Sequence, residues 1–263
     1  MTRIVRAELR RLLRPRTLAV ASGATLLFSV VATLTVFSTA RAASGGPSRR
    51  AGTTLAALTG RGGGTEAFAV GASFVGFLVF VTFIALSANE FSGGTFRSLV
   101  LRDPNRVRVI AGKVVGALIV AGGVVALAEL LTFALSVAVA PTKEISSSGW
   151  FSLGGAAAAL RDYATVLGGV TGWAVFGTTL AVIFRSAPVA LGVGFGWAGP
   201  FENIVVDSWR AGYRYFPGQV LASLIQGGTT ELGLGRALVT ASLYGAVAGA
   251  TALLLVRGRD VSA

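Results

Sequence analysis

Six long apolar segments, separated by shorter stretches that hold most of the charged residues, make up most of the sequence. A helix that crosses a bilayer needs about 20 predominantly apolar residues, and these segments are close to that length or exceed it. The pattern therefore predicts an all-α integral membrane protein with one transmembrane domain over residues 1–263. Its predicted spans are about 17–40, 67–89, 114–140, 163–184, 186–206 and 237–256.

The composition agrees with a membrane protein and excludes several kinds of chemistry. Only 13% of the residues are charged, whereas a soluble domain carries about 25%. The net charge of +12 comes from cations that flank apolar spans, so we expect the lipid bilayer and no nucleic acid as a partner. The absence of Cys and His excludes disulfides, haem, His-ligated metals and a His-based catalytic relay. The composition does not exclude a metal site built from carboxylates alone, but we predict no metal site and no catalytic residue.

The distribution of Lys and Arg predicts the orientation. With the N-terminus inside, fourteen of these cations fall in cytoplasmic segments and nine in outer ones, and the largest cluster precedes the first span. Both termini are therefore expected in the cytoplasm. Arg outnumbers Lys 21 to 2, which together with many Ala, Gly and Val is typical of GC-rich bacterial coding, so we expect a multi-pass protein of the bacterial plasma membrane.

The N-terminal segment, residues 1–15, has a helical period of its own. Its apolar side chains recur at helical spacing and its arginines fall on the opposite side, which predicts an amphipathic helix lying in the membrane interface. A positively charged flank without further function is the alternative. Arg14-Pro15 predicts a break before the first span. The residues are Ile4, Val5, Leu9, Leu12 and Leu13 on one side and Arg3, Arg6, Arg10 and Arg14 on the other.

The first apolar segment also has the basic start and the "ARA" motif of a secretory signal peptide. Its apolar run is longer than the roughly 7 to 15 residues of such a peptide, so we expect the segment to be retained. The outer loop that follows, residues 41–66, is rich in Gly, Ser, Thr and Arg and is predicted to be flexible.

One cytoplasmic loop, "ANEFSGGTFRSLVLRDPNRVRVIAGK", is unlike the others. After Gly93-Gly94, Phe96, Leu99 and Val100 recur at the spacing of one helix face, which predicts a short amphipathic helix over residues 92–101. Asp103-Pro104-Asn105 stops it. A solvated loop has no need of an apolar face, so we expect another protein to cover it.

This loop resembles the corresponding part of the permease subunit of type 2 ABC transporters, the ABC-2 type exporter family. The resemblance extends to the amphipathic N-terminus, the six spans and "FGTTLAVIFRSAPVALGVGFG" across spans four and five, and Asp103 is its one clear departure. It implies that the short helix is a coupling helix seated on a separate ATPase. The ATPase-coupling residues would be Glu90, Gly94, Thr95, Phe96, Arg97, Leu99, Val100, Pro104, Arg106 and Lys113, and Gly112 also matches the pattern.

The resemblance further implies a partner set and a function. Two ATP-binding cassette subunits would bind ATP and Mg. A second permease subunit, the same or related, would complete a dimer. The substrate would be an exported amphipathic or lipid-like compound such as a drug, an antibiotic or a lipid. The chain itself lacks a G-x-x-x-x-G-K-[ST] phosphate loop, because Val114 follows Gly112-Lys113. We therefore expect a transport subunit that is not an enzyme and holds no cofactor.

Two acidic residues are candidate pathway residues. Glu129 interrupts the third span, where a charge usually faces the bundle interior, finds a partner or lines a pathway. Glu202 lies near the end of the short, Pro-containing fifth span, which is predicted to be broken. The segment "YRYFPGQVLASLIQGG" after it predicts either a short helix that dips back into the outer leaflet or a surface loop. Two other function classes stay open: a secondary transporter coupled to protons or ions through Glu129, and an intramembrane enzyme, for which no nucleophile and base are recognisable.

Overall fold

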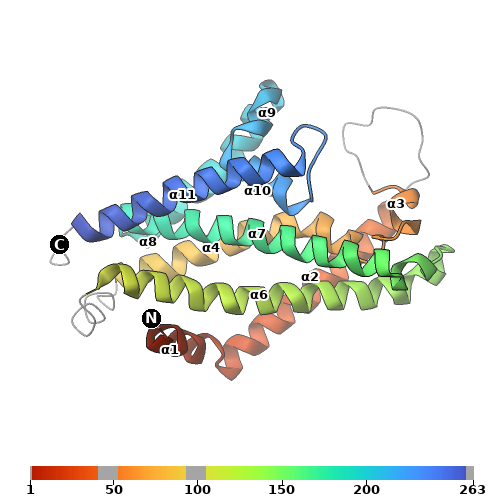
Figure 1. Cartoon of the computed structure of the whole chain (residues 1–263), viewed down its shortest axis with the longest axis horizontal. Helices are drawn as coiled ribbons and strands as arrows, with labels where there is room; N and C mark the ends of the chain where they lie inside the picture. The colour runs from red at the N-terminus through yellow and green to blue at the C-terminus, as the bar shows by residue number, and fades with distance from the viewer. Residues whose placement is uncertain (1, 41–52, 93–104, 259–263) are drawn as a thin grey trace.

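The computed structural model describes residues 2–40, 53–92 and 105–258, and this part of the chain is helical without a strand. Six helices in it are long and apolar enough to cross a membrane. Figure 1 shows most of them side by side along the long axis, with both chain termini at the same end of the bundle. Their bounds are α2 Pro15–Thr39, α4 Glu66–Ser92, α6 Arg106–Val139, α7 Leu153–Phe184, α11 Leu234–Gly258 and a composite helix from α8 Ala187–Gly196 to α9 Glu202–Ser208.

Helices α6 and α7 begin eight and ten residues before the predicted spans, because helix caps, and not charges, set their starts. The side chain of Asn105 accepts a hydrogen bond from the backbone N–H of Arg108 at 3.0 Å and caps α6. The hydroxyl of Ser152 does the same for Gly155 at 3.1 Å and caps α7. A side-chain acceptor at this position satisfies an N–H that the helix leaves free. The charged residues that bounded the apolar runs therefore lie within the helices.

The core of the bundle forms around α7, which packs against α4, α6, α10 and α11. Phe80, Ile84, Val170 and Trp173 are buried there. Close packing of α4 on α7 depends on Gly177, since a Cβ at this position would lie 2.9 Å from the carbonyl oxygen of Phe80. Small residues let backbones approach in this way in membrane bundles.

The outer surface of the bundle is apolar. Large hydrophobic side chains such as Val20, Leu27, Phe74, Val239 and Leu254 are exposed on three different long helices. A soluble protein rarely exposes contiguous apolar surface on this scale. The surface therefore agrees with the span lengths in indicating a multi-pass membrane protein.

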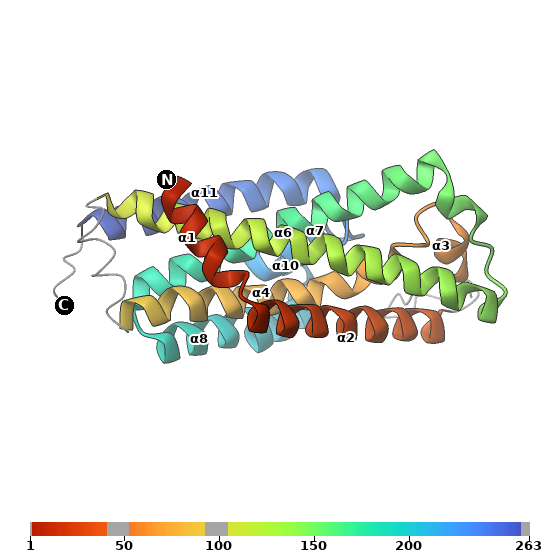
Figure 2. The same ribbon diagram turned by 90° about the horizontal axis from the view of Figure 1, so that it is seen from below.

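At the N-terminus, helix α1 (Thr2–Leu12) ends before Arg14, whose extended backbone (φ −67°, ψ 144°) leads into α2. The predicted break is therefore confirmed. Helix α1 crosses α6 (Figure 2), with Ile4 over Gly112 and Glu8 over Gly116. The contact face of α1 thus includes an acid beside the apolar side chains that the sequence places on one face.

Three short helices of the described part lie at the end of the bundle away from the termini (Figure 1): α3 (Leu55–Thr59), η1 (Ala140–Lys143) and η2 (Ser148–Phe151). Leu58 is fully buried, and the indole N–H of Trp150 donates a hydrogen bond to its carbonyl oxygen at 2.9 Å. The expectation of a flexible loop is therefore wrong for residues 53–65, because a tryptophan far along the chain orders them. Residues 41–52 lie outside the described part.

The fifth span is irregular, but it is not broken as the sequence predicts, because the chain stays helical from Ala187 to Ser208. Between α8 and α9 the chain forms a π-type turn, η3 (Trp197–Phe201), which contains Pro200. Proline has no N–H to continue the helical ladder, which accounts for the irregularity. Figure 1 shows α9 standing away from the other long helices.

After α9, the turn η4 (Arg210–Arg214) leads to helix α10 (Pro217–Ile225). Helix α10 packs on α7, α11 and α4, and Val220, Leu221, Leu224 and Ile225 are buried. Of the two predictions for this segment, the short helix is confirmed and the surface loop is wrong, whereas entry of the helix into the outer leaflet stays a prediction.

Candidate functional site

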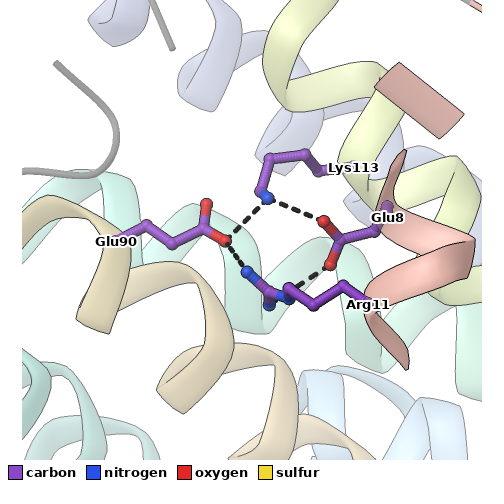
Figure 3. A network of polar contacts seen from close by, with 4 residues as sticks. All are labelled: Glu8, Arg11, Glu90 and Lys113. Atoms are coloured by element: carbon purple, nitrogen blue, oxygen red, sulfur yellow. Dashed lines mark hydrogen bonds and ion pairs between the residues drawn. The ribbon is translucent and has the colours of Figure 1, made fainter. Parts of the chain in front are cut away.

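Four charged side chains from three helices form a closed network at the end of the bundle that holds both termini (Figure 3). The Lys113 Nζ on α6 lies 2.7 Å from Glu90 Oε1 at the end of α4 and 2.8 Å from Glu8 Oε2 on α1. The Arg11 guanidinium, also on α1, lies 2.9 Å from Glu90 Oε1 and 3.2 Å from Glu8 Oε1. Each cation therefore contacts both acids, and we call these four residues the charge network.

The charge network is largely removed from solvent. Side-chain exposure is 6% for Glu8, 11% for Glu90 and 16% for Lys113, whereas Arg11 is 38% exposed. Buried charges are tolerated when they are paired and hydrogen-bonded, and removing one member of such a pair is costly. Two cations balance two acids here, so the network holds α1, α4 and α6 together without net charge.

A small pocket, with a cavity volume of about 30 Å³, adjoins the charge network. The four charged residues line one part of it, and apolar side chains, among them Phe83, Ile110 and Val182, line another. The hydroxyl of Thr178 on α7 also faces the pocket and is buried without a hydrogen-bond partner in the described part of the chain. The pocket thus offers polar and apolar surfaces side by side.

The structure brings together two of the sequence-predicted coupling residues, Glu90 and Lys113. Arg106, a third, lies in the first turn of α6, and its Nη1 donates to the carbonyl oxygen of Val256 on α11 at 3.5 Å. The other coupling residues lie outside the described part: Gly94, Thr95, Phe96, Arg97, Leu99, Val100 and Pro104.

Sequence reasoning missed Glu8 and Arg11 as members of this site. The period of α1 placed the arginines on a polar face directed at water or lipid headgroups, and Glu8 received no role. A signal was present, because Glu8 is the one acid in the cationic segment 1–16. A single carboxylate among six arginines in that segment indicates an internal ion pair.

The two candidate pathway residues occupy different surroundings. Glu129 lies within α6, is 8% exposed, and its Oε1 has no hydrogen-bond partner in the described residues. Glu202, at the start of α9, is fully buried and accepts hydrogen bonds from the backbone N–H groups of Gly218 and Gln219, both at 3.2 Å. Its carboxyl group therefore caps α10 and ties it to α9, since the first N–H groups of a helix need acceptors.

Comparison with models of known protein families finds no match, and comparison with curated proteins finds none either. Among the described residues, no group of three or more His, Cys, Asp or Glu side chains is placed to hold a metal ion.

Proposed function

We propose that the chain is the permease subunit of an ATP-binding cassette exporter of the ABC-2 type, driven by ATP that a separate ATPase hydrolyses. In this proposal two ATPase subunits, which bind ATP and Mg, dock on the cytoplasmic end. A second permease subunit, the same or related, completes the translocation path, and the assembly lies in the bacterial plasma membrane with both termini in the cytoplasm.

The observation that carries the proposal is the position of the charge network. Glu90 lies just before residues 93–104 and Lys113 just after them, so the network flanks the predicted coupling helix along the chain. The two side chains contact each other directly and both contact α1. A displacement of the coupling segment by an ATPase would therefore move α1, α4 and α6 together and would not be limited to the loop.

The substrate class in this proposal, an amphipathic or lipid-like compound, rests on the sequence resemblance. The pocket beside the charge network places charged and apolar side chains together, but its cavity of about 30 Å³ is smaller than a ligand site of about 300 to 1,000 Å³. The pocket is enclosed by α1, α4, α6 and α7, at the same end as the proposed ATPase contact.

The test is ATPase retention by the full chain. The affinity-tagged protein is purified from membranes of its own host, and ATP hydrolysis by the purified material is measured for the wild type and for Phe96→Ala with Leu99→Ala. Burial of one such side chain contributes roughly 1.5 to 3 kcal/mol, so the double variant is expected to insert normally but to lose the ATPase.

A matched control is Phe74→Ala with Leu78→Ala. This pair removes the same two side-chain types from α4, at positions that are exposed on the outer surface of the bundle. The control should retain the ATPase. A wild type that carries no ATP hydrolysis, or a Phe96/Leu99 variant that retains as much as the control, would contradict the proposal.

A further inference from the structure

Three acidic side chains lie in the half of the bundle away from the charge network. They are Glu66 at the start of α4, Glu129 in α6 and Asp162 in α7, and Asp162 lies close enough to interact electrostatically with each of the others. None of the ion pairs among the described residues includes any of the three. The sequence holds 23 Lys and Arg residues and 11 Asp and Glu residues, so a shortage of cationic side chains does not explain why these three acids form no ion pair within the described residues.

Other buried acids of this protein have partners, which makes Glu129 exceptional. Glu8 and Glu90 each contact both cations of the charge network. Glu202 accepts two backbone N–H groups. Glu129 is more than nine-tenths buried, and its Oε1 contacts neither a donor nor a cation in the described part of the chain.

The helices packed against α6 supply no compensating charge at Glu129. Helix α2 contributes no titratable side chain beyond Arg16 at its start. On α7, the exposed Arg161 interacts with Asp162 but donates to the carbonyl oxygen of Gly227 at 3.0 Å, and Tyr163 donates to the carbonyl oxygen of Gly122 at 3.3 Å. Helix α4 adds a further acid, Glu66. The helices α1 and α11 meet α6 near its start, where Ile4, Glu8 and Val256 lie.

Hydroxyl groups lie near these acids. Thr65, itself buried, donates to Asp162 Oδ2 at 2.7 Å. Thr132 and Ser136 follow Glu129 by three and seven residues on α6, the spacing of one helix face. Both are fully buried, and their hydroxyl oxygens have no partner in the described residues. Unpartnered buried oxygens next to unpaired carboxyl groups are the ligands that a small hard cation uses.

We propose that Glu129 and Asp162 bind one small monovalent cation inside the bundle, either a proton or an alkali metal ion. One cation would compensate Glu129, which has no donor or cation at its Oε1 in the described part of the chain, because an uncompensated acid inside a membrane protein is costly. A multivalent metal is disfavoured, since the described residues contain no group of three metal-binding side chains placed to hold it. The site needs no ATPase, so its failure would leave the proposed transport function untouched, and the reverse also holds.

The experiment uses the purified full chain in lipid nanodiscs. In one arm, the melting temperature is compared in sodium, potassium and choline chloride at equal ionic strength and fixed pH. In the other, the infrared absorption of protonated carboxyl groups is recorded at neutral pH in choline chloride. Each arm is run on the wild type, on Glu129→Gln and on Glu144→Gln, which removes an exposed acid as the control.

An alkali-ion site predicts a melting temperature that rises in sodium or potassium relative to choline, because a ligand that binds the folded state stabilises it. The rise should be lost in Glu129→Gln and kept in Glu144→Gln. A proton site predicts a protonated-carboxyl band that Glu129→Gln removes and Glu144→Gln leaves. If Glu129→Gln does not fold, Asp162→Asn replaces it with the same expectations. Melting that is independent of the cation, together with no band lost in the variant, would overturn the proposal.

Discussion

Replacement of Lys113 by Met removes the cation at the centre of the charge network while keeping most of the side-chain volume. In the wild type, the Lys113 Nζ contacts Glu90 Oε1 at 2.7 Å and Glu8 Oε2 at 2.8 Å. Without it, two largely buried carboxyl groups face a methyl group and share Arg11 as their only remaining cation within the network. We expect Lys113→Met to destabilise the protein for this reason.

The size of the effect follows from burial. Breaking a buried ion pair by removing one partner costs about 3 to 5 kcal/mol, because the other charge stays buried and uncompensated. Arg11 still contacts both acids, but its side chain is 38% exposed, and solvent weakens the attraction between its charge and the two carboxylates. The free energy of unfolding should therefore fall by about 3 kcal/mol, at the lower end of that range.

The assay is denaturant unfolding of the purified protein in detergent micelles, followed by circular dichroism. The chain has one other lysine, Lys143, which is exposed in η1 at the opposite end of the bundle. Lys143→Met makes the same chemical change outside any buried network and should alter stability by no more than about 0.5 kcal/mol.

A double-mutant cycle with Glu90→Gln isolates the contact itself. Side chains in direct contact show coupling energies of about 0.5 to 3 kcal/mol, so the double variant should lose less stability than the sum of the single variants. Equal effects of Lys113→Met and Lys143→Met, or strict additivity in the cycle, would refute the view that the charge network joins α1, α4 and α6.

Two further predictions concern packing and topology. Gly177→Val places a Cβ 2.9 Å from a backbone oxygen of α4 and should lower the free energy of unfolding by about 1 to 3 kcal/mol through overpacking. The control is Gly123→Val on α6, where a Cβ meets nothing within 4 Å, and its loss should be smaller in the same unfolding assay. Equal losses would contradict the close contact of α4 with α7. Reporter domains placed after Ala263 and next to Gly228 should report the cytoplasm and the outside respectively, and the same side for both would contradict the six-span topology.

Much of the architecture could be predicted from the sequence because it depends on local properties. The six spans follow from the lengths of the apolar runs, the break before α2 from Arg14-Pro15, and the irregular fifth span from Pro200. Helix α10 followed from Pro217 at its start and from Gly227-Gly228 at its end, where both glycines adopt positive φ angles. In each case, one side chain or one run of side chains decides the backbone without help from distant residues.

The tertiary structure alone decided which charged and polar residues meet. Glu8 and Glu90 are far apart in sequence. The crossing of α1 over the glycines of α6 brings Glu8 to Lys113, and the packing of α4 against α6 brings Glu90. The pairing of Trp150 with Leu58 orders a segment whose composition predicts flexibility, and the isolation of Glu129 follows from what α2 and α7 place beside it. The physical reason is that apolar burial has no direction and fixes only which segments enter the membrane. Ion pairs and hydrogen bonds require particular atoms to meet, and the packing of helices that are distant in sequence determines which atoms come together.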